Sequence, residues 1–120
     1  MSYGALITVR LESKRFPQKA LQKINNQSIL EIILNRLKKV EKEKNIVICT
    51  YKSKKNNLLK KIAKNHGVKI FFGSENNILK RMIDCAKKNQ FKYIFRLTGD
   101  NPYIDYENYK RLKLLSKKKM

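Results

Sequence analysis

The chain has 120 residues, of which 42% are hydrophobic, and a formal net charge of +20 at pH 7. This length suits one domain with a modest core, and no apolar run is long enough to form a membrane-spanning helix. The first residues, Met1 to Gly4, lack the basic region of a secretory signal, and the two cysteines, Cys49 and Cys85, lie far apart. Because separated cysteines of this kind are typical of reduced, buried thiols, we expect a cytoplasmic protein with no membrane contact.

The positive charge is a weak guide to function. Lysine supplies 23 of the 29 basic residues and is spread over every predicted helix and loop, and the chain is also rich in asparagine and isoleucine. A selected nucleic-acid site would concentrate its cations on one face. We interpret the excess as a general drift in composition, and no specific nucleic-acid partner is expected.

Strands and helices alternate along the chain. Residues 5–9 and 45–50 are apolar runs that predict buried strands, and residues 68–72 and 93–97 predict a third and a fourth strand. Residues 20–24 predict a short extended piece before a turn at Asn25 and Asn26. The pair Ser28 and Glu31 is a capping-box signature that starts the first helix.

Three further helices follow from the spacing of apolar residues. Gly67 is placed to end the second helix in a left-handed conformation, whereas Ser74 and Asp105 are placed to cap the third and fourth. The expected core stripes of these helices consist of Leu58, Leu59, Ile62 and Ala63; Ile78, Leu79, Met82, Ile83 and Ala86; and Tyr109, Leu112 and Leu115.

This pattern predicts an α/β fold with an open, parallel, Rossmann-like sheet, because helices between strands make right-handed crossovers. The expected strand order is 3-2-1-4, which places the first and fourth strands side by side at the switch point. Residues 4–116 form the single predicted domain, and residues 117–120 are expected to be a basic tail.

A basic loop from Arg10 to Lys19 follows the first strand directly. Ligands of open α/β sheets bind at the carboxyl ends of strands, so Arg10, Ser13, Arg15 and Lys19 are candidates for a phosphate site. The alternative is a solvated basic loop. The sequence contains neither a Walker motif nor a G-x-G-x-x-G fingerprint, and Ser13 has no evident histidine partner for nucleophilic catalysis.

Asp100 follows the fourth strand, between Gly99 and Pro102. A lone carboxylate at such a position suits Mg²⁺, which completes its coordination with water and phosphate oxygens. An Asx-turn is the alternative interpretation. In the strand order 3-2-1-4, Asp100 and the basic loop face each other, and cations opposite a metal-binding carboxylate would make a triphosphate site.

The order of motifs resembles a known family. The pattern R-x-x-S-x-R-x-P-x-K at residues 10–19 is similar to that of the cytidylyltransferases that make CMP-activated sugar acids, most of all the branch called spore coat polysaccharide biosynthesis protein F. Residues 72–81 resemble the family's G-S-E-x-x-V-L-x-R segment, and residues 96–105 resemble its R-x-T-G-D-x-P-x-I-D segment. CMP-sialic acid and CMP-KDO synthetases are more distant relatives.

The resemblance implies transfer of CMP from CTP to a sugar hydroxyl, with release of pyrophosphate, in polysaccharide biosynthesis. By matching position, Arg10, Ser13, Arg15 and Lys19 would hold the triphosphate and Asp100 would bind Mg²⁺. Arg10, Lys19 and Asp100 are thus the expected catalytic residues. Glu12 stands where the family often has glycine, so its carboxylate would have to turn away from the phosphates.

Family members are longer, so the resemblance also implies that this chain corresponds to their N-terminal half. The expected partners are CTP, a sugar-acid substrate, and either a second copy or a complementing chain. The alternative is an inactive fragment that binds polyanions nonspecifically. Arg81 and Arg96 match family arginines without an assigned role, and a buried structural cation is one interpretation of Arg96.

Overall fold

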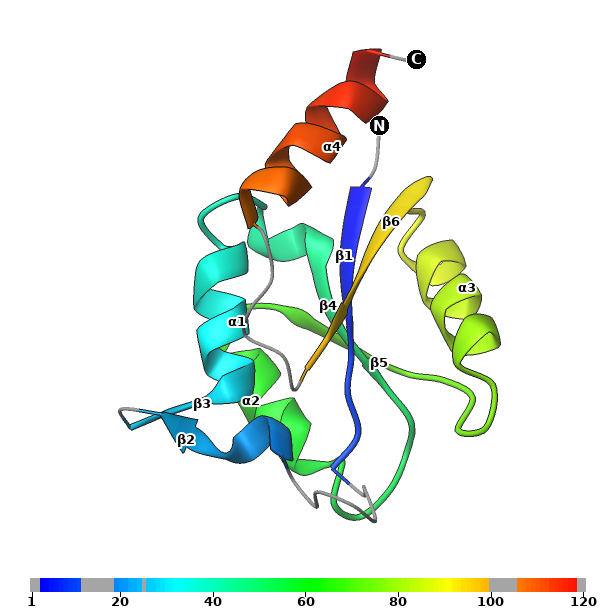
Figure 1. Ribbon diagram of the computed structural model, residues 1–120. Helices are drawn as coiled ribbons and strands as arrows, with labels where there is room; N and C mark the ends of the chain where they lie inside the picture. Colours follow the sequence, from blue (N-terminus) through cyan, green and yellow to red (C-terminus); the bar gives the residue numbers. More distant parts are fainter. Residues whose placement is uncertain (1–2, 12–18, 25, 100–105, 119–120) are drawn as a thin grey trace.

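Four parallel strands form the central sheet of the computed structural model, which describes residues 3–11, 19–24, 26–99 and 106–118 (Figure 1). They are β1 (Tyr3–Thr8), β4 (Ile46–Thr50), β5 (Lys69–Phe72) and β6 (Tyr93–Thr98), and they lie in the order β5-β4-β1-β6. The predicted order 3-2-1-4 is therefore confirmed.

The two inner strands carry the core. Every residue of β1 and β4 is buried, as expected for parallel strands that are covered on both faces. The outer strands β5 and β6 keep several residues partly or fully exposed. In the register of the sheet, Thr8 lies opposite Cys49 on one side and Thr98 on the other. The chain segments after β1, β4 and β6 consequently start close to one another.

Helices cover the sheet on both faces. Helices α1 (Ile29–Leu37) and α2 (Leu58–His66) pack on one face, where they share a core with Ile7, Ile48 and Leu97. Helix α3 (Ile78–Lys88) lies on the other face (Figure 1). There its Met82 and Cys85 pack against residues of β1 and β4.

Helix α4 (Tyr106–Lys118) belongs to the α1 side of the sheet. The ring of Tyr109 packs on that of Phe95 with 4.5 Å between centroids, and its hydroxyl donates to Oε2 of Glu41 at 2.7 Å. The helix extends into the segment that was expected to be a basic tail.

Two predicted helix ends are confirmed. The Oγ atom of Ser28 accepts a hydrogen bond from the backbone N–H of Glu31, and the Glu31 carboxylate accepts one from the backbone of Ser28. Gly67 ends α2 with φ 68°, in the left-handed region. Both cysteines are buried and free, as the sequence predicts.

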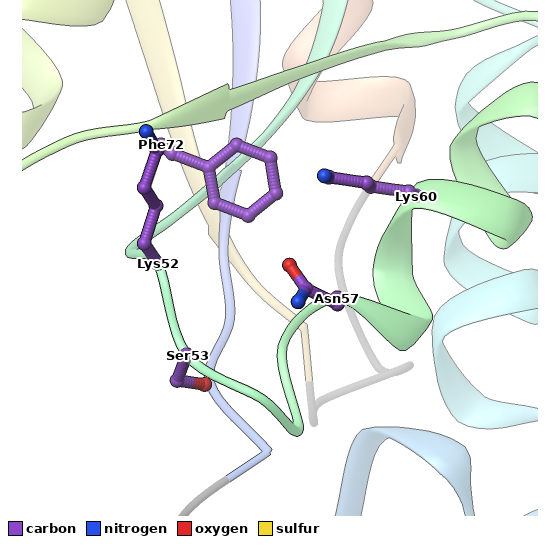
Figure 2. A pocket seen from close by; sticks show the side chains of 5 residues that line it. All are labelled: Lys52, Ser53, Asn57, Lys60 and Phe72. Atoms are coloured by element: carbon purple, nitrogen blue, oxygen red, sulfur yellow. The ribbon is translucent and has the colours of Figure 1, made fainter.

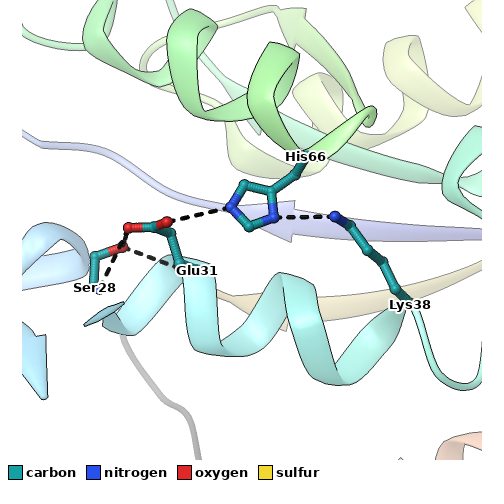
Figure 3. Close-up of polar contacts among 4 residues, drawn as sticks. All are labelled: Ser28, Glu31, Lys38 and His66. Carbon is teal, nitrogen blue, oxygen red and sulfur yellow. Dashed lines mark hydrogen bonds and ion pairs between the residues drawn. The ribbon is translucent and has the colours of Figure 1, made fainter. Parts of the chain in front are cut away.

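A polar chain links the first two helices (Figure 3). Nε2 of His66 lies 3.3 Å from Oε2 of Glu31, and Nδ1 lies 3.1 Å from Nζ of Lys38. With its proton on Nε2, the ring donates to the carboxylate and accepts from the ammonium group. Burial tends to raise the pKa of Glu31, but the hydrogen bonds from His66 and Ser28 outweigh burial and lower it.

Local predictions failed at two turns. The segment expected to be extended begins with a 3₁₀ turn, η1 (Lys19–Leu21), before β2 (Lys23–Ile24) pairs with β3 (Gln27–Ser28) in an antiparallel hairpin. Helix α3 begins after Asn77, whose side chain accepts from the N–H of Lys80, and not after Ser74. Another 3₁₀ turn, η2 (Glu43–Asn45), precedes β4. The predicted cap Asp105 lies outside the described residues.

The expected core stripes are too wide. Leu58 of α2 and the three α3 residues Ile78, Leu79 and Ile83 have exposed fractions of 42–64%. The reason is geometric, because a helix lying on a sheet buries only the side that touches it. For α3 that side consists of Arg81, Met82 and Cys85.

Candidate functional site

The carboxyl ends of β1 and β6 lie in direct contact. The N–H of Gly99, which follows β6, donates to the carbonyl of Thr8 in β1 at 3.0 Å. On the other side of β1, the N–H of Val9 donates to the carbonyl of Cys49 in β4 at 3.3 Å. A Cβ atom on Gly99 would come within 2.7 Å of Cβ of Val9, so glycine is required for this approach. The start of the basic loop and the residue before Asp100 are therefore neighbours.

The structure describes only part of the predicted site. Arg10 is exposed directly after β1, and Lys19 opens the 3₁₀ turn η1. Ser13, Arg15 and Asp100 lie outside the described residues. The phosphate and metal roles of the set consequently stay predictions, although β1 and β6 are adjacent as those roles require.

The start of the basic loop is anchored by a residue that the sequence did not indicate. The side chain of Asn56 is fully buried; its Oδ1 accepts from the N–H of Leu11 at 2.8 Å, and its Nδ2 donates to the carbonyl of Tyr51 at 3.0 Å. Its own N–H donates to Oγ of Ser53 at 3.0 Å. One amide thus joins the segment that carries Arg10 to the loop after β4.

Arg81 is a buried cation with a positioning role. Its Nε donates to the carbonyl of Ser74 at 2.7 Å, and its Nη2 donates to the carbonyl of Glu75 at 3.1 Å. The guanidinium lies over the ring of Tyr51, 5.3 Å from the centroid. Arg81 therefore fixes the segment after β5 against the loop after β4.

Arg96 is exposed, and its interpretation as a buried structural cation is wrong. It lies on the edge strand β6, where its Nε donates to Oγ1 of Thr8 at 3.3 Å. The Thr8 hydroxyl in turn donates to the carbonyl of Leu97 at 3.3 Å. Arg96 thus places a solvent-accessible positive charge near the ends of β1 and β6.

An open pocket of about 440 Å³ lies at the carboxyl ends of β4 and β5 (Figure 2). It is bounded by the segment after β4, the start of α2 and the end of β5, and its lining residues are Lys52, Ser53, Asn57, Lys60 and Phe72. Nζ of Lys60 lies 5.3 Å from the ring centroid of Phe72. Because two lysines and no acidic residue line it, the pocket favours an anionic ligand.

Other chemistries find no support in the described ranges. The hydrogen bond between the two thiols, together with burial, raises the pKa of Cys49, whereas the same hydrogen bond lowers the pKa of Cys85. Both thiols are fully buried, so neither is placed to attack a substrate. Among residues 3–11, 19–24, 26–99 and 106–118, no three His, Cys, Asp or Glu side chains gather as a metal-binding group. Nor does this part of the chain contain a helix long and apolar enough to cross a membrane.

Comparison with known proteins agrees with this arrangement. A family model described as "Cytidylyltransferase" matches residues 5–119. Uncharacterized protein MJ1063 of Methanocaldococcus jannaschii is 38% identical over 107 residues, which are 89% of this chain and 44% of that protein. The spore coat polysaccharide biosynthesis protein SpsF of Bacillus subtilis is 31% identical over 106 residues, covering 85% of this chain and 44% of its own.

Two solved structures share the fold. A cytidylyltransferase from Leptospira borgpetersenii superposes with a TM-score of 0.88 and 36% sequence identity. The match covers 96% of this chain and 48% of the Leptospira chain. A CMP:2-keto-3-deoxy-manno-octonic acid synthetase complexed with CTP superposes with a TM-score of 0.79, over 98% of this chain and 48% of its own. At 18% identity, the second likeness shows the fold alone. The chain spans about half the length of these relatives.

Proposed function

Because the chain belongs to the cytidylyltransferase family, we propose that it binds the triphosphate of CTP at the carboxyl ends of β1 and β6. In this proposal CMP passes from CTP to a hydroxyl of a sugar acid, and pyrophosphate is released. The name of the Bacillus subtilis relative supports a role in polysaccharide biosynthesis. The family that the model over residues 5–119 describes, cytidylyltransferase, supports the choice of a cytidine nucleotide.

One observation carries the proposal: the close contact of Gly99 with Thr8 and Val9. Because of this contact, the start of the basic loop lies beside Gly99, which directly precedes Asp100. The exposed Arg96 is close to both, since it donates a hydrogen bond to Thr8. A triphosphate needs cations around its oxygens, and an arginine fork matches two phosphate oxygens at once. We assign this role to Arg10, Ser13, Arg15 and Lys19.

Mg²⁺ is the proposed cofactor. A single carboxylate, that of Asp100, fits this ion, because Mg²⁺ is commonly held by one or two carboxylates together with phosphate oxygens and water. When bound, the ion would neutralise the charge that develops on the phosphates. The residues of this chain would orient the α-phosphorus of CTP for in-line displacement, so their contribution is positioning and charge neutralisation.

Isothermal titration with CTP and Mg²⁺ tests the proposal. We expect saturable binding by the 120-residue chain, with at least about tenfold weaker affinity for Lys19→Ala and Asp100→Ala. The control is Lys61→Ala, which removes one exposed lysine from α2. A folded sample that gives no binding, or equal affinity in all three variants, would contradict the assignment. Salt-sensitive binding of any polyanion, unaffected by Asp100→Ala, would instead support the inactive-fragment alternative.

A further inference from the structure

The pocket at the carboxyl ends of β4 and β5 opens on the α2 face of the sheet. Phe72, the last residue of β5, forms its aromatic wall, and Nζ of Lys60 reaches over that ring from the first turn of α2 (Figure 2). Side chains alternate along a strand, and Ile70 packs on the α2 side while Phe71 packs on the α3 side. Phe72 therefore faces α2, and the sheet separates the pocket from α3.

This pocket is separate from the proposed nucleotide site. That site lies at β1 and β6, whereas β4 and β5 are on the other side of β1, and β5 and β6 are opposite edges of the sheet. With about 4.8 Å between neighbouring strands, the ends of β5 and β6 are roughly 14 Å apart. Among the described residues, the pocket lining includes neither Arg10 nor Lys19. A ligand of this pocket would thus be a second ligand of the protein.

The charge of the pocket favours a phosphate. Lys52 and Lys60 are both exposed, and no salt bridge engages either of them within the described part of the chain. Their ammonium groups can therefore pair with a bound anion. A phosphate monoester carries a charge of about −1.5 to −2 at pH 7, which matches two lysines, and lysine binds phosphate as a point charge.

Two further side chains suit the hydroxyl groups of a sugar. The Oγ atom of Ser53 accepts from the N–H of Asn56 at 3.0 Å, which leaves its own hydrogen to donate. The side chain of Asn57 makes no capping hydrogen bond to α2, so its amide can both donate to a ligand and accept from it (Figure 2). The volume of about 440 Å³ is in the usual range for small-molecule sites and is more than a bare phosphate ion fills.

A buried hydroxyl group lies beneath the pocket. Thr50 ends β4 and lies opposite Phe72 in the register of the sheet. Ile46 and Ile48 pack on the α2 side, so alternation directs Thr50 to that side as well. Its side chain is fully buried, and within the residues that the structure describes its Oγ1 atom has no hydrogen-bond partner. Because an unsatisfied buried hydroxyl is costly, this atom favours an oxygen-bearing ligand seated against it.

We propose that this pocket binds a small hydroxylated molecule that carries one phosphate monoester, as a sugar phosphate does. The phosphate group pairs with Lys52 and Lys60, and the hydroxyl groups bond to Ser53 and Asn57. The hydroxyl of Thr50 bonds to a ligand oxygen at the base of the pocket. Nothing in this assignment requires CTP or the residues of the basic loop.

Titration with ribose 5-phosphate, followed in amide NMR spectra without CTP, tests the proposal. We expect saturable shifts at residues 52–60 and 72, weaker binding of inorganic phosphate, and no binding of free ribose. The double variant Lys52→Gln/Lys60→Gln should bind at least about tenfold more weakly, because hydrogen bonds to charged groups are the strong ones. Thr50→Val should bind at least about threefold more weakly. Without ligand, Thr50→Val should be at least as stable as the wild type, because it removes an unsatisfied hydroxyl.

The matched control is Lys87→Gln/Lys88→Gln, which removes the same charge from α3. Lys88 also lies over a phenyl ring, 5.8 Å from the centroid of Phe71, but on the other face of the sheet. At equal ionic strength this variant should bind like the wild type.

Four results would overturn the proposal. They are no binding of ribose 5-phosphate, equal binding of inorganic phosphate, equal affinities of the two double variants, and shifts that concentrate at residues 10–19. An unchanged affinity of Thr50→Val would overturn the role of that hydroxyl. Lys19→Ala should bind ribose 5-phosphate like the wild type, so the result does not depend on the proposed nucleotide site.

Discussion

Replacing Asn56 with alanine should destabilise the protein strongly. The side chain is fully buried and joins two buried backbone groups, the N–H of Leu11 and the carbonyl of Tyr51. Leaving a buried polar group unsatisfied costs about 1–3 kcal/mol. Counting both groups and the small cavity, we expect the free energy of unfolding to fall by about 3 kcal/mol, which is a large part of the stability of a small domain.

Urea denaturation followed by circular dichroism measures this loss. With an m-value of about 1.5 kcal/mol/M, a loss of 3 kcal/mol lowers the midpoint by about 2 M. The control is Asn57→Ala, because the neighbouring Asn57 is exposed and its side chain makes no capping hydrogen bond. That variant should lose less than about 0.5 kcal/mol. Equal midpoints for the two variants would refute the anchoring role of Asn56.

Three further predictions concern packing and pH. The pKa of Glu31 is lower in the folded than in the unfolded protein, so the ionised carboxylate stabilises the fold above the unfolded pKa, and this stabilisation is lost as pH falls through the folded pKa. Glu31→Gln removes the titrating group and should therefore make the urea midpoint decline less steeply between about pH 6 and pH 3. A decline as steep as that of the wild type would contradict this. Gly67→Ala should cost about 1–2 kcal/mol, because φ is 68° and the new Cβ would meet the carboxylate of Glu43, whereas a neutral result in thermal unfolding would refute the strain. Tyr109→Phe should cost about 1.5–3 kcal/mol by chemical denaturation, since the phenol donates to the buried carboxylate of Glu41; wild-type stability would show that another group satisfies that oxygen.

The sequence was sufficient to predict the framework. The apolar runs of β1 and β4 are continuous because both faces of these strands are buried, so composition alone marks them as the centre of the sheet. The Ser28–Glu31 capping box and Gly67 act through neighbouring backbone atoms, and local patterns of this kind can be read without tertiary context. The strand order then followed from the general rules for parallel sheets.

Contacts between distant segments could not be predicted. Asn56 is one of two consecutive asparagines in a lysine-rich loop, and only the fold shows that it lies opposite Leu11 while Asn57 faces solvent. The exposure of Leu79 and Ile83 was missed for a similar reason. An apolar stripe indicates that a helix face can be buried against another surface, but it does not show which of its residues the fold of this chain covers.

Burial distinguishes the structural cations of this chain from those that a ligand can reach, and position in the sequence does not. Arg81 is enclosed and uses its guanidinium to hold two backbone carbonyls, so it is committed to fixing the loop after β5. Arg10 and Arg96 remain exposed next to the contact between Gly99 and Thr8. Cations whose side chains are open to solvent beside a hydrogen-bonded strand end can reach a phosphate without first breaking contacts inside the protein. The basic loop is thus distinguished from the other lysine-rich segments by the rigid contact from which it starts, and not by its charge.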